Sequence, residues 1–104
     1  MIIRHRQFER FTVYCHLQEI RVQMDQVVKR GDVIGLMGDT GDAGACKPAC
    51  PHVHFELSSV ASGHSSWVPG VTFDPLPLIV GCFDPSRTYA SDRLVLTYPV
   101  RCRI

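Results

Sequence analysis

The sequence of 104 residues contains no long apolar run and no strong excess of either charge. None of its hydrophobic stretches approaches the roughly 20 residues that a membrane-spanning helix requires. The formal net charge is +1, so the charge balance gives no reason to expect nucleic acid as a partner. The N-terminus becomes polar after residue 3, which excludes a signal peptide within this stretch.

Internal repeats, heptads and amphipathic helices of ordinary length are also missing, which excludes a coiled coil or a repeat array. Hydrophobic residues make up 45% of the chain and charged residues 20%, as in ordinary globular domains. A chain of this length supports one domain with a modest core.

The remaining pattern is that of β-strands. Residues 10–17 alternate, with Phe11, Val13, Cys15 and Leu17 on one face of a strand and Thr12, Tyr14 and His16 on the other. Further strands are expected over 1–4, 20–22, 33–37, 52–58 and 93–103, the last confined to an edge by Pro99. Residues 6–9 would form a hairpin turn, and residues 74–78 a tight turn or a single helical turn. We predict an all-β domain built on a small antiparallel sheet.

Five cysteines are many for this length, and the odd number leaves at least one unpaired, bonded to another chain or bound to a ligand. Cys46 and Cys50 could close a small ring, and Cys82 and Cys102 could tie back the C-terminal tail. Spacing does not fix either pairing. The cysteine content favours an exported protein.

Two histidines, His52 and His54, are spaced so that a strand presents both on one side. Such a pair is either half of a metal or acid–base site, or a pair of exposed surface histidines. Glu56 shares that face and would accept a hydrogen bond from an imidazole N–H or be solvated. The preceding loop, 38–51, contains three glycines and two prolines, which suggests a functional rim.

Three stretches together resemble a known family: residues 13–17 (VYCHL), 27–35 (VVKRGDVIG), and 38–41 (GDTG) leading to 51–56 (PHVHFE). In this order they are similar to the LytM/lysostaphin-type zinc endopeptidases of peptidase family M23, and the resemblance runs over residues 1–79. It implies a small antiparallel β-domain of the barrel-sandwich, duplicated hybrid motif-like type, with a groove over the sheet. It also implies cleavage of peptidoglycan cross-bridge peptides and an extracellular or periplasmic location.

The same resemblance assigns roles to three histidines. His54 would be a zinc ligand. His52 would be a catalytic histidine that orients or deprotonates the attacking water. His16 would be the second catalytic histidine, placed to stabilise the oxyanion or the water. Zinc would polarise the scissile carbonyl and lower the pKa of its water toward about 7.

The sequence departs from the family in its metal ligands. A catalytic zinc site typically has three protein ligands, and the family takes two of them from an upstream His-x-x-x-Asp segment that has no match before Arg10. His5 and Glu9 share that spacing, but His5 occupies the place of a non-ligand histidine of the family, so we leave it unassigned. Three explanations remain: an N-terminal part carrying the ligands is missing, the chain is a degenerate binder, or substitute ligands come from Asp39, Asp42, Cys46 or Cys50.

We therefore expect an M23-like domain over residues 1–79 that is incomplete or inactive as an isolated chain, followed by an extension, 80–104, of unassigned role packed on it. The alternative is a non-catalytic module that binds cell-wall peptide or regulates a partner. A lipoyl-like carrier is a weaker alternative, because Lys29 does not stand at a hairpin tip. An open sheet edge could also drive self-association.

Other side chains have simpler expectations. Cys15 follows the strand alternation away from His16, so we expect a core thiol and not a nucleophile. Tyr14 shares the predicted face of His16 and would line the groove or cap the core. Trp67 would stack on a ligand at the rim or anchor its loop. His64 is expected to be exposed.

Overall fold

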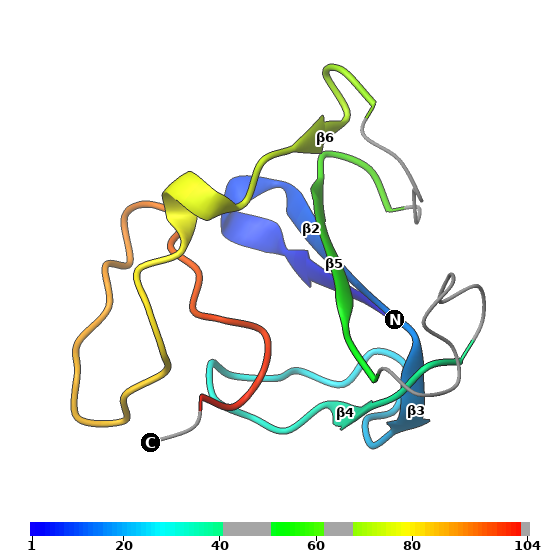
Figure 1. Cartoon of the computed structure of the whole chain (residues 1–104). Coiled ribbons are helices and arrows are strands. Elements are labelled where there is room, and N and C mark those ends of the chain that lie inside the picture. The colour runs from blue at the N-terminus through cyan, green and yellow to red at the C-terminus, as the bar shows by residue number, and fades with distance from the viewer. Residues whose placement is uncertain (41–50, 62–67, 103–104) are drawn as a thin grey trace.

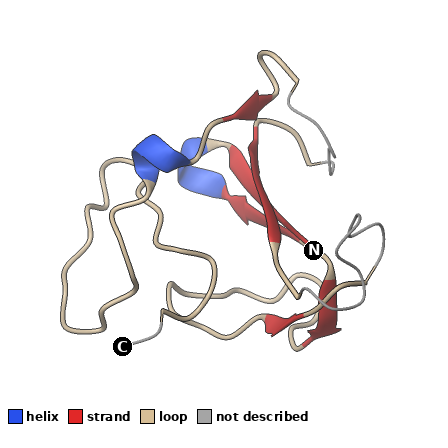
Figure 2. Ribbon diagram, viewed as in Figure 1, coloured by secondary structure: helices blue, strands red, loops and turns tan. Residues whose placement is uncertain are grey.

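The computed structural model describes residues 1–40, 51–61 and 68–102. In this part of the chain the only helices are two single 3-10 turns, η1 (Arg6–Phe8) and η3 (Leu76–Leu78), and everything else is strand or loop (Figure 2). The predicted all-β class is confirmed. Among the described residues no helix is long and apolar enough to cross a membrane.

The larger sheet has four antiparallel strands in the order β1-β2-β5-β6. They are β1 (Ile2–His5), β2 (Arg10–Cys15), β5 (His54–Ser58) and β6 (Thr72–Phe73). Figure 1 shows β2 and β5 together in the middle of this sheet. The first, second and fifth strands lie where alternation predicted them, within two residues. The two-residue strand β6 was not expected.

A second sheet pairs β3 (Leu17–Ile20) with β4 (Gly35–Met37), and it lies below the larger sheet in Figure 1. Glycine is required here because the two strands approach closely. A Cβ on Gly35 would collide with the backbone oxygen of Glu19, and one on Gly38 would come within 2.6 Å of the Gln18 side chain. The strand predicted over 20–22 corresponds to β3, which begins three residues earlier, at Leu17.

The register of the sheet decides which side chains share a face. Val13 lies opposite Glu56, and Thr12 lies opposite Leu57. Directly opposed residues of an antiparallel pair project to the same side, so Val13 and Glu56 share one face while Thr12 and Leu57 share the other. All four of these residues are buried. The centre of the sheet is therefore covered on both sides.

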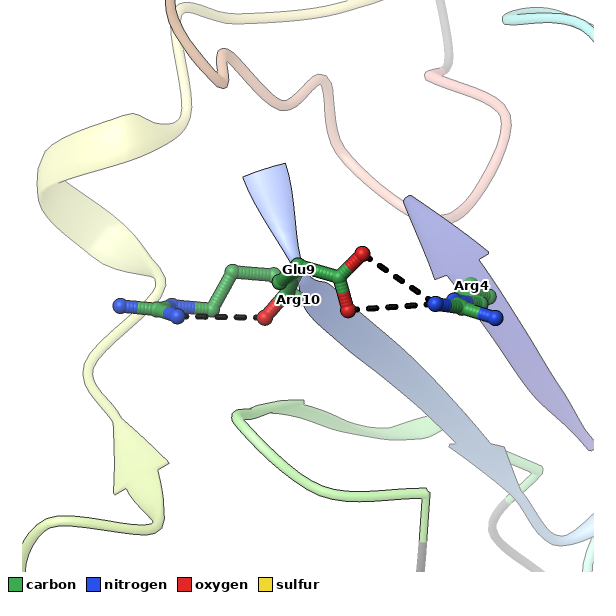
Figure 3. A network of polar contacts seen from close by, with 3 residues as sticks. All are labelled: Arg4, Glu9 and Arg10. Atoms are coloured by element: carbon green, nitrogen blue, oxygen red, sulfur yellow. Dashed lines mark hydrogen bonds and ion pairs between the residues drawn. The ribbon is translucent and has the colours of Figure 1, made fainter. Parts of the chain in front are cut away.

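The turn between β1 and β2 is fixed by charged side chains. Glu9 ends η1 in the left-handed conformation, with φ 47°. Its carboxylate accepts two hydrogen bonds from Arg4, at 3.1 and 3.2 Å, and its carbonyl oxygen accepts one from Arg10 (Figure 3). The predicted hairpin turn is confirmed as a compact 3-10 turn.

The C-terminal segment, residues 79–102, packs without a regular strand. The strand predicted over 93–103 is wrong: its described residues, 93–102, make one parallel bridge, Leu96 with Ile79. Hydrogen bonds from Val80 N–H to the Leu96 carbonyl and from Leu96 N–H to the Leu78 carbonyl support it. Leu96 is buried nonetheless. The Cys82–Cys102 disulfide, one of the pairings left open above, is present.

A cavity of about 1370 Å³ lies between the Tyr14 face of the larger sheet, the loop before β4 and the C-terminal segment. Apolar side chains from all three parts line it, among them Ile3, Tyr14, Phe55, Ile34 and Val95. Arg30 crosses the space to donate a hydrogen bond to the Val95 carbonyl at 2.9 Å. The C-terminal segment is thus held to the domain by both apolar and polar contacts.

Candidate active site

His16 leaves the strand alternation at the junction of the two sheets. β2 ends at Cys15 and β3 begins at Leu17, while His16 between them takes a left-handed backbone conformation with φ 66°. Such a conformation is uncommon for a residue other than glycine, and it reverses the expected direction of the side chain. The prediction that His16 shares a face with Thr12 and Tyr14 is therefore wrong.

The three histidines singled out in the sequence lie together. The ring centroid of His16 is 4.9 Å from that of His52 and 6.0 Å from that of His54. His54 projects from the sheet face that carries Cys15 and Val13, since it lies opposite Cys15. The bend at His16 brings its ring to this side. Tyr14 lies on the other face, where its ring packs edge-on against Phe55 at 5.2 Å.

His52 is positioned by a backbone bridge and not by strand β5, which begins only at His54. Its N–H donates to the Gly38 carbonyl at 3.0 Å, and the two residues form an isolated antiparallel bridge. The predicted strand over 52–58 is thus shorter than expected. The two histidines nevertheless both lie beside His16, as the predicted site requires.

A backbone carbonyl fixes the tautomer of His16. Its Nδ1 lies 2.6 Å from the carbonyl oxygen of Thr40. A carbonyl oxygen can only accept a hydrogen bond, so Nδ1 carries the proton and neutral His16 keeps its lone pair on Nε2. The Thr40 hydroxyl in turn donates to the Leu17 carbonyl at 2.6 Å, which ties residue 40 to the start of β3. Sequence patterns gave no indication of this contact.

Glu56 holds the His54 ring. Its Oε1 lies 2.8 Å from His54 Nε2. The Glu56 side chain is 6% exposed, whereas that of His54 is 38% exposed. With Nε2 directed at the carboxylate, Nδ1 is the nitrogen with which His54 would bind a metal ion. Of the two alternatives left open for Glu56, the structure shows the hydrogen bond to an imidazole and not the solvated carboxylate.

Cys15 lies closer to the site than predicted. It is directly opposite His54 across β2 and β5, so its side chain projects to the same face of the sheet. It forms no disulfide and is partly exposed. The expectation that Cys15 points to the side opposite the histidines is wrong, because His16 and not Cys15 departs from the alternation.

His5 belongs to a different polar group on the opposite face of the sheet. It lies opposite Arg10, and its Nε2 is 2.8 Å from the Thr12 hydroxyl, which donates to the Tyr14 hydroxyl at 3.0 Å. Burial and the nearby Arg30 guanidinium lower the pKa of His5. Burial raises the pKa of Tyr14, and the Thr12 hydrogen bond partly offsets this. The sheet separates His5 from His54, in agreement with leaving it unassigned as a ligand.

The described residues do not hold a complete set of metal ligands at this site. Over 1–40, 51–61 and 68–102 no group of three or more His, Cys, Asp or Glu side chains is arranged to hold a metal ion. Of the candidate substitute ligands, Asp39 lies in this part of the chain and joins no such group, while Asp42, Cys46 and Cys50 lie outside it. Trp67 and His64 also lie outside the described residues. A full zinc ligand set is not found here.

The part of the chain that holds the histidine cluster matches a known protein family. Residues 1–66 match the model of peptidase family M23, a range that includes His16, His52 and His54. The chain belongs to peptidase family M23.

A peptidoglycan DD-endopeptidase of Vibrio cholerae, ShyA, is similar to this M23 chain over a shorter stretch. The two are 46% identical over 46 residues, which is 44% of this chain and 10% of the relative. The chain therefore spans a small fraction of the length of this relative. No solved structure matches the chain.

Proposed function

We propose that this M23 chain is a metallopeptidase-type domain that acts on peptidoglycan cross-bridge peptides, with His16 and His52 as catalytic residues and His54 as a zinc ligand. The observation that carries the proposal is the convergence of the three rings at the junction of the two sheets. Family membership and the ShyA relative support the substrate class. An extracellular or periplasmic location follows from that substrate.

His16 is suited to handle a proton at one defined atom. Its Nδ1 proton is held by the Thr40 carbonyl, so Nε2 is the atom that would take a proton from water. Once protonated at Nε2, the imidazolium would stabilise negative charge on a tetrahedral intermediate. His52, beside it, would orient the same water or the peptide.

A catalytic zinc site typically needs three protein ligands, and the described residues hold no such group, so we propose His54 as a single ligand among them. We therefore derive no step through the metal. The isolated chain is proposed to be incomplete as a catalyst. The lone ligand also favours a second candidate function, a non-catalytic module that binds cell-wall peptide at the histidine cluster.

We further propose that residues 80–104 extend the M23-like domain, 1–79, and form no separate unit. The buried Leu96, the Ile79 bridge and the Arg30 hydrogen bond to Val95 support a common core.

The test is incubation of the purified chain with insoluble bacterial peptidoglycan and zinc, scoring co-sedimentation and, by mass spectrometry, released peptides. His16→Ala and His52→Ala are compared with His5→Gln, a histidine change on the opposite face of the sheet. Cleavage lost in the first two variants alone would establish a complete enzyme. Binding without cleavage, weakened by the same two changes, is the result we expect. If the chain neither binds nor cleaves peptidoglycan, the proposed function is overturned.

A further inference from the structure

The loop between β3 and β4, residues 21–34, extends from these strands toward the C-terminal segment (Figure 1). Arg30 in this loop donates a hydrogen bond to the Val95 carbonyl at 2.9 Å. Its guanidinium also lies over the ring of Tyr89, 4.5 Å from the centroid. Both partners belong to the C-terminal segment, so one side chain connects the loop to that segment twice.

A second contact lies beside the first. A Cβ on Gly31 would come within 2.5 Å of the Phe83 ring, so this ring packs against the glycine and leaves no room for a side chain. The rings of Phe83 and Tyr89 stack with centroids 6.4 Å apart. Both lie between Cys82 and Cys102 in the sequence, within the loop that the disulfide closes. The disulfide therefore helps to hold together the surface that contacts the β3–β4 loop.

The opposite end of the same two strands carries the histidine cluster. β3 begins at Leu17, directly after His16, and β4 ends at Met37, directly before Gly38. The Gly38 carbonyl accepts a hydrogen bond from the His52 N–H at 3.0 Å. The positions of both histidines thus depend on the order of the β3–β4 sheet.

The β3–β4 sheet needs support from other parts of the molecule. It has two strands and pairs with no strand of the larger sheet in the part of the chain that the structure describes. Its residues are half-buried or exposed, and none is fully buried. A two-stranded sheet is at best marginally stable by itself in water. Contacts with the C-terminal segment therefore contribute to its order.

We propose that the C-terminal segment supports the β3–β4 loop through Arg30 and thereby positions His16 and His52. Reduction of the Cys82–Cys102 bridge loosens this support, so the order of the histidine cluster depends on oxidising surroundings. A dithiol supplies two electrons and two protons: the S–S bond breaks, two thiols form, and the dithiol becomes a disulfide. Cys82 is exposed and Cys102 is half-buried, so a small dithiol can reach the bridge. The proposal concerns the position of the histidines and holds whether or not they take part in peptide cleavage.

Hydrogen–deuterium exchange followed by NMR, with and without excess dithiothreitol, tests the redox dependence. After reduction the His52 amide, bonded to Gly38, should exchange at least about tenfold faster, and the Val13 amide at the centre of the larger sheet should change much less. The double variant Cys82→Ser, Cys102→Ser should show the faster exchange with or without the reductant. Unchanged exchange at His52, equal acceleration at Val13, or a reductant effect that persists in the double variant would overturn the proposal.

Arg30→Met and Arg87→Met form a matched pair that leaves the disulfide intact. Arg30 joins the loop to the C-terminal segment, whereas Arg87 lies over the same Tyr89 ring, at 5.2 Å, but belongs to the segment itself. Arg30→Met should accelerate exchange of the His52 amide and change the nitrogen-15 spectrum of the His16 imidazole, and Arg87→Met should do neither. Equal effects of the two variants, or no effect of Arg30→Met, would contradict a positioning role for Arg30.

Discussion

The Nδ1 atom of His16 lies 2.6 Å from the carbonyl oxygen of Thr40. This contact joins the bend after β2 to the chain that follows β4, so it links the two sheets at the histidine cluster. It also determines that Nε2 is the proton-accepting atom of neutral His16. The orientation of His16 therefore depends on a backbone group whose own position depends on the Thr40 hydroxyl.

Thr40→Val tests this dependence. Removing the hydroxyl that bonds to the Leu17 carbonyl should lower the free energy of unfolding by about 1 kcal/mol and loosen the carbonyl that orients His16. Nitrogen-15 NMR of the imidazole should then show a mixture of His16 tautomers in place of the Nδ1–H form. Thr97→Val is the control, because the Thr97 hydroxyl has no hydrogen bond within the described structure. An unchanged His16 spectrum in Thr40→Val would contradict this role of Thr40.

Glu56 should contribute to stability because its carboxylate is buried against His54. Glu56→Ala leaves the His54 ring without its acceptor and should cost about 1–3 kcal/mol in urea unfolding. Glu56→Gln, which keeps an acceptor oxygen, should cost less. Glu19→Gln, in a half-exposed ion pair with Arg21, should change stability by about 0.5 kcal/mol or less. Equal effects of Glu56→Ala and Glu19→Gln would show that the His54 contact is not stabilising.

Stability should fall on acidification because of His5. Its pKa in the folded chain is lowered from 6.5 by burial and by Arg30, so the unfolded chain binds the proton more readily. The free energy of unfolding therefore rises with pH in the window between the lowered pKa and 6.5, and it is diminished below that window. His5→Gln should flatten the pH dependence of the melting temperature between about pH 5 and 7. A profile that His5→Gln leaves unchanged would assign the acid sensitivity to other groups.

The Cys82–Cys102 disulfide should stabilise the C-terminal segment. The bridge closes a loop between residues 20 positions apart, and native disulfides of this kind typically contribute about 2–4 kcal/mol. The double variant Cys82→Ser, Cys102→Ser should lose stability by that amount and become sensitive to proteolysis near Leu96. Cys15→Ser, which breaks no disulfide, is the control. Equal stability of the double variant and the control would mean that the segment is held by packing alone.

Much of the sheet could be predicted, because β1, β2 and β5 carry alternating side chains rich in the β-branched and aromatic residues that favour strands. The left-handed bend at His16 could not, since a non-glycine residue takes that conformation only when surrounding contacts impose it. The C-terminal segment was predicted as a strand from weak alternation. In the structure the described residues of this segment form a single bridge, Leu96 with Ile79, and no regular strand.

The members of the candidate site were predicted, but their geometry was not. From their spacing, His52, His54 and Glu56 were predicted to lie together. In the structure His52 and His54 both lie beside His16, and Glu56 contacts His54. The Thr40 carbonyl is a backbone group, and no side-chain pattern reports such a contact. The approach of Cys15 to His54 follows from strand register, which depends on long-range pairing.

Zinc affinity and stoichiometry of the purified chain, measured by competition titration beside His54→Ala, test the central claim most directly. If His54 is the one zinc ligand that the isolated chain provides, zinc should bind with a dissociation constant above about 1 μM and with less than one tightly held ion per chain. His54→Ala should weaken it further. One zinc per chain bound at submicromolar affinity, and lost in His54→Ala, would contradict the account and show that the chain holds a complete ligand set.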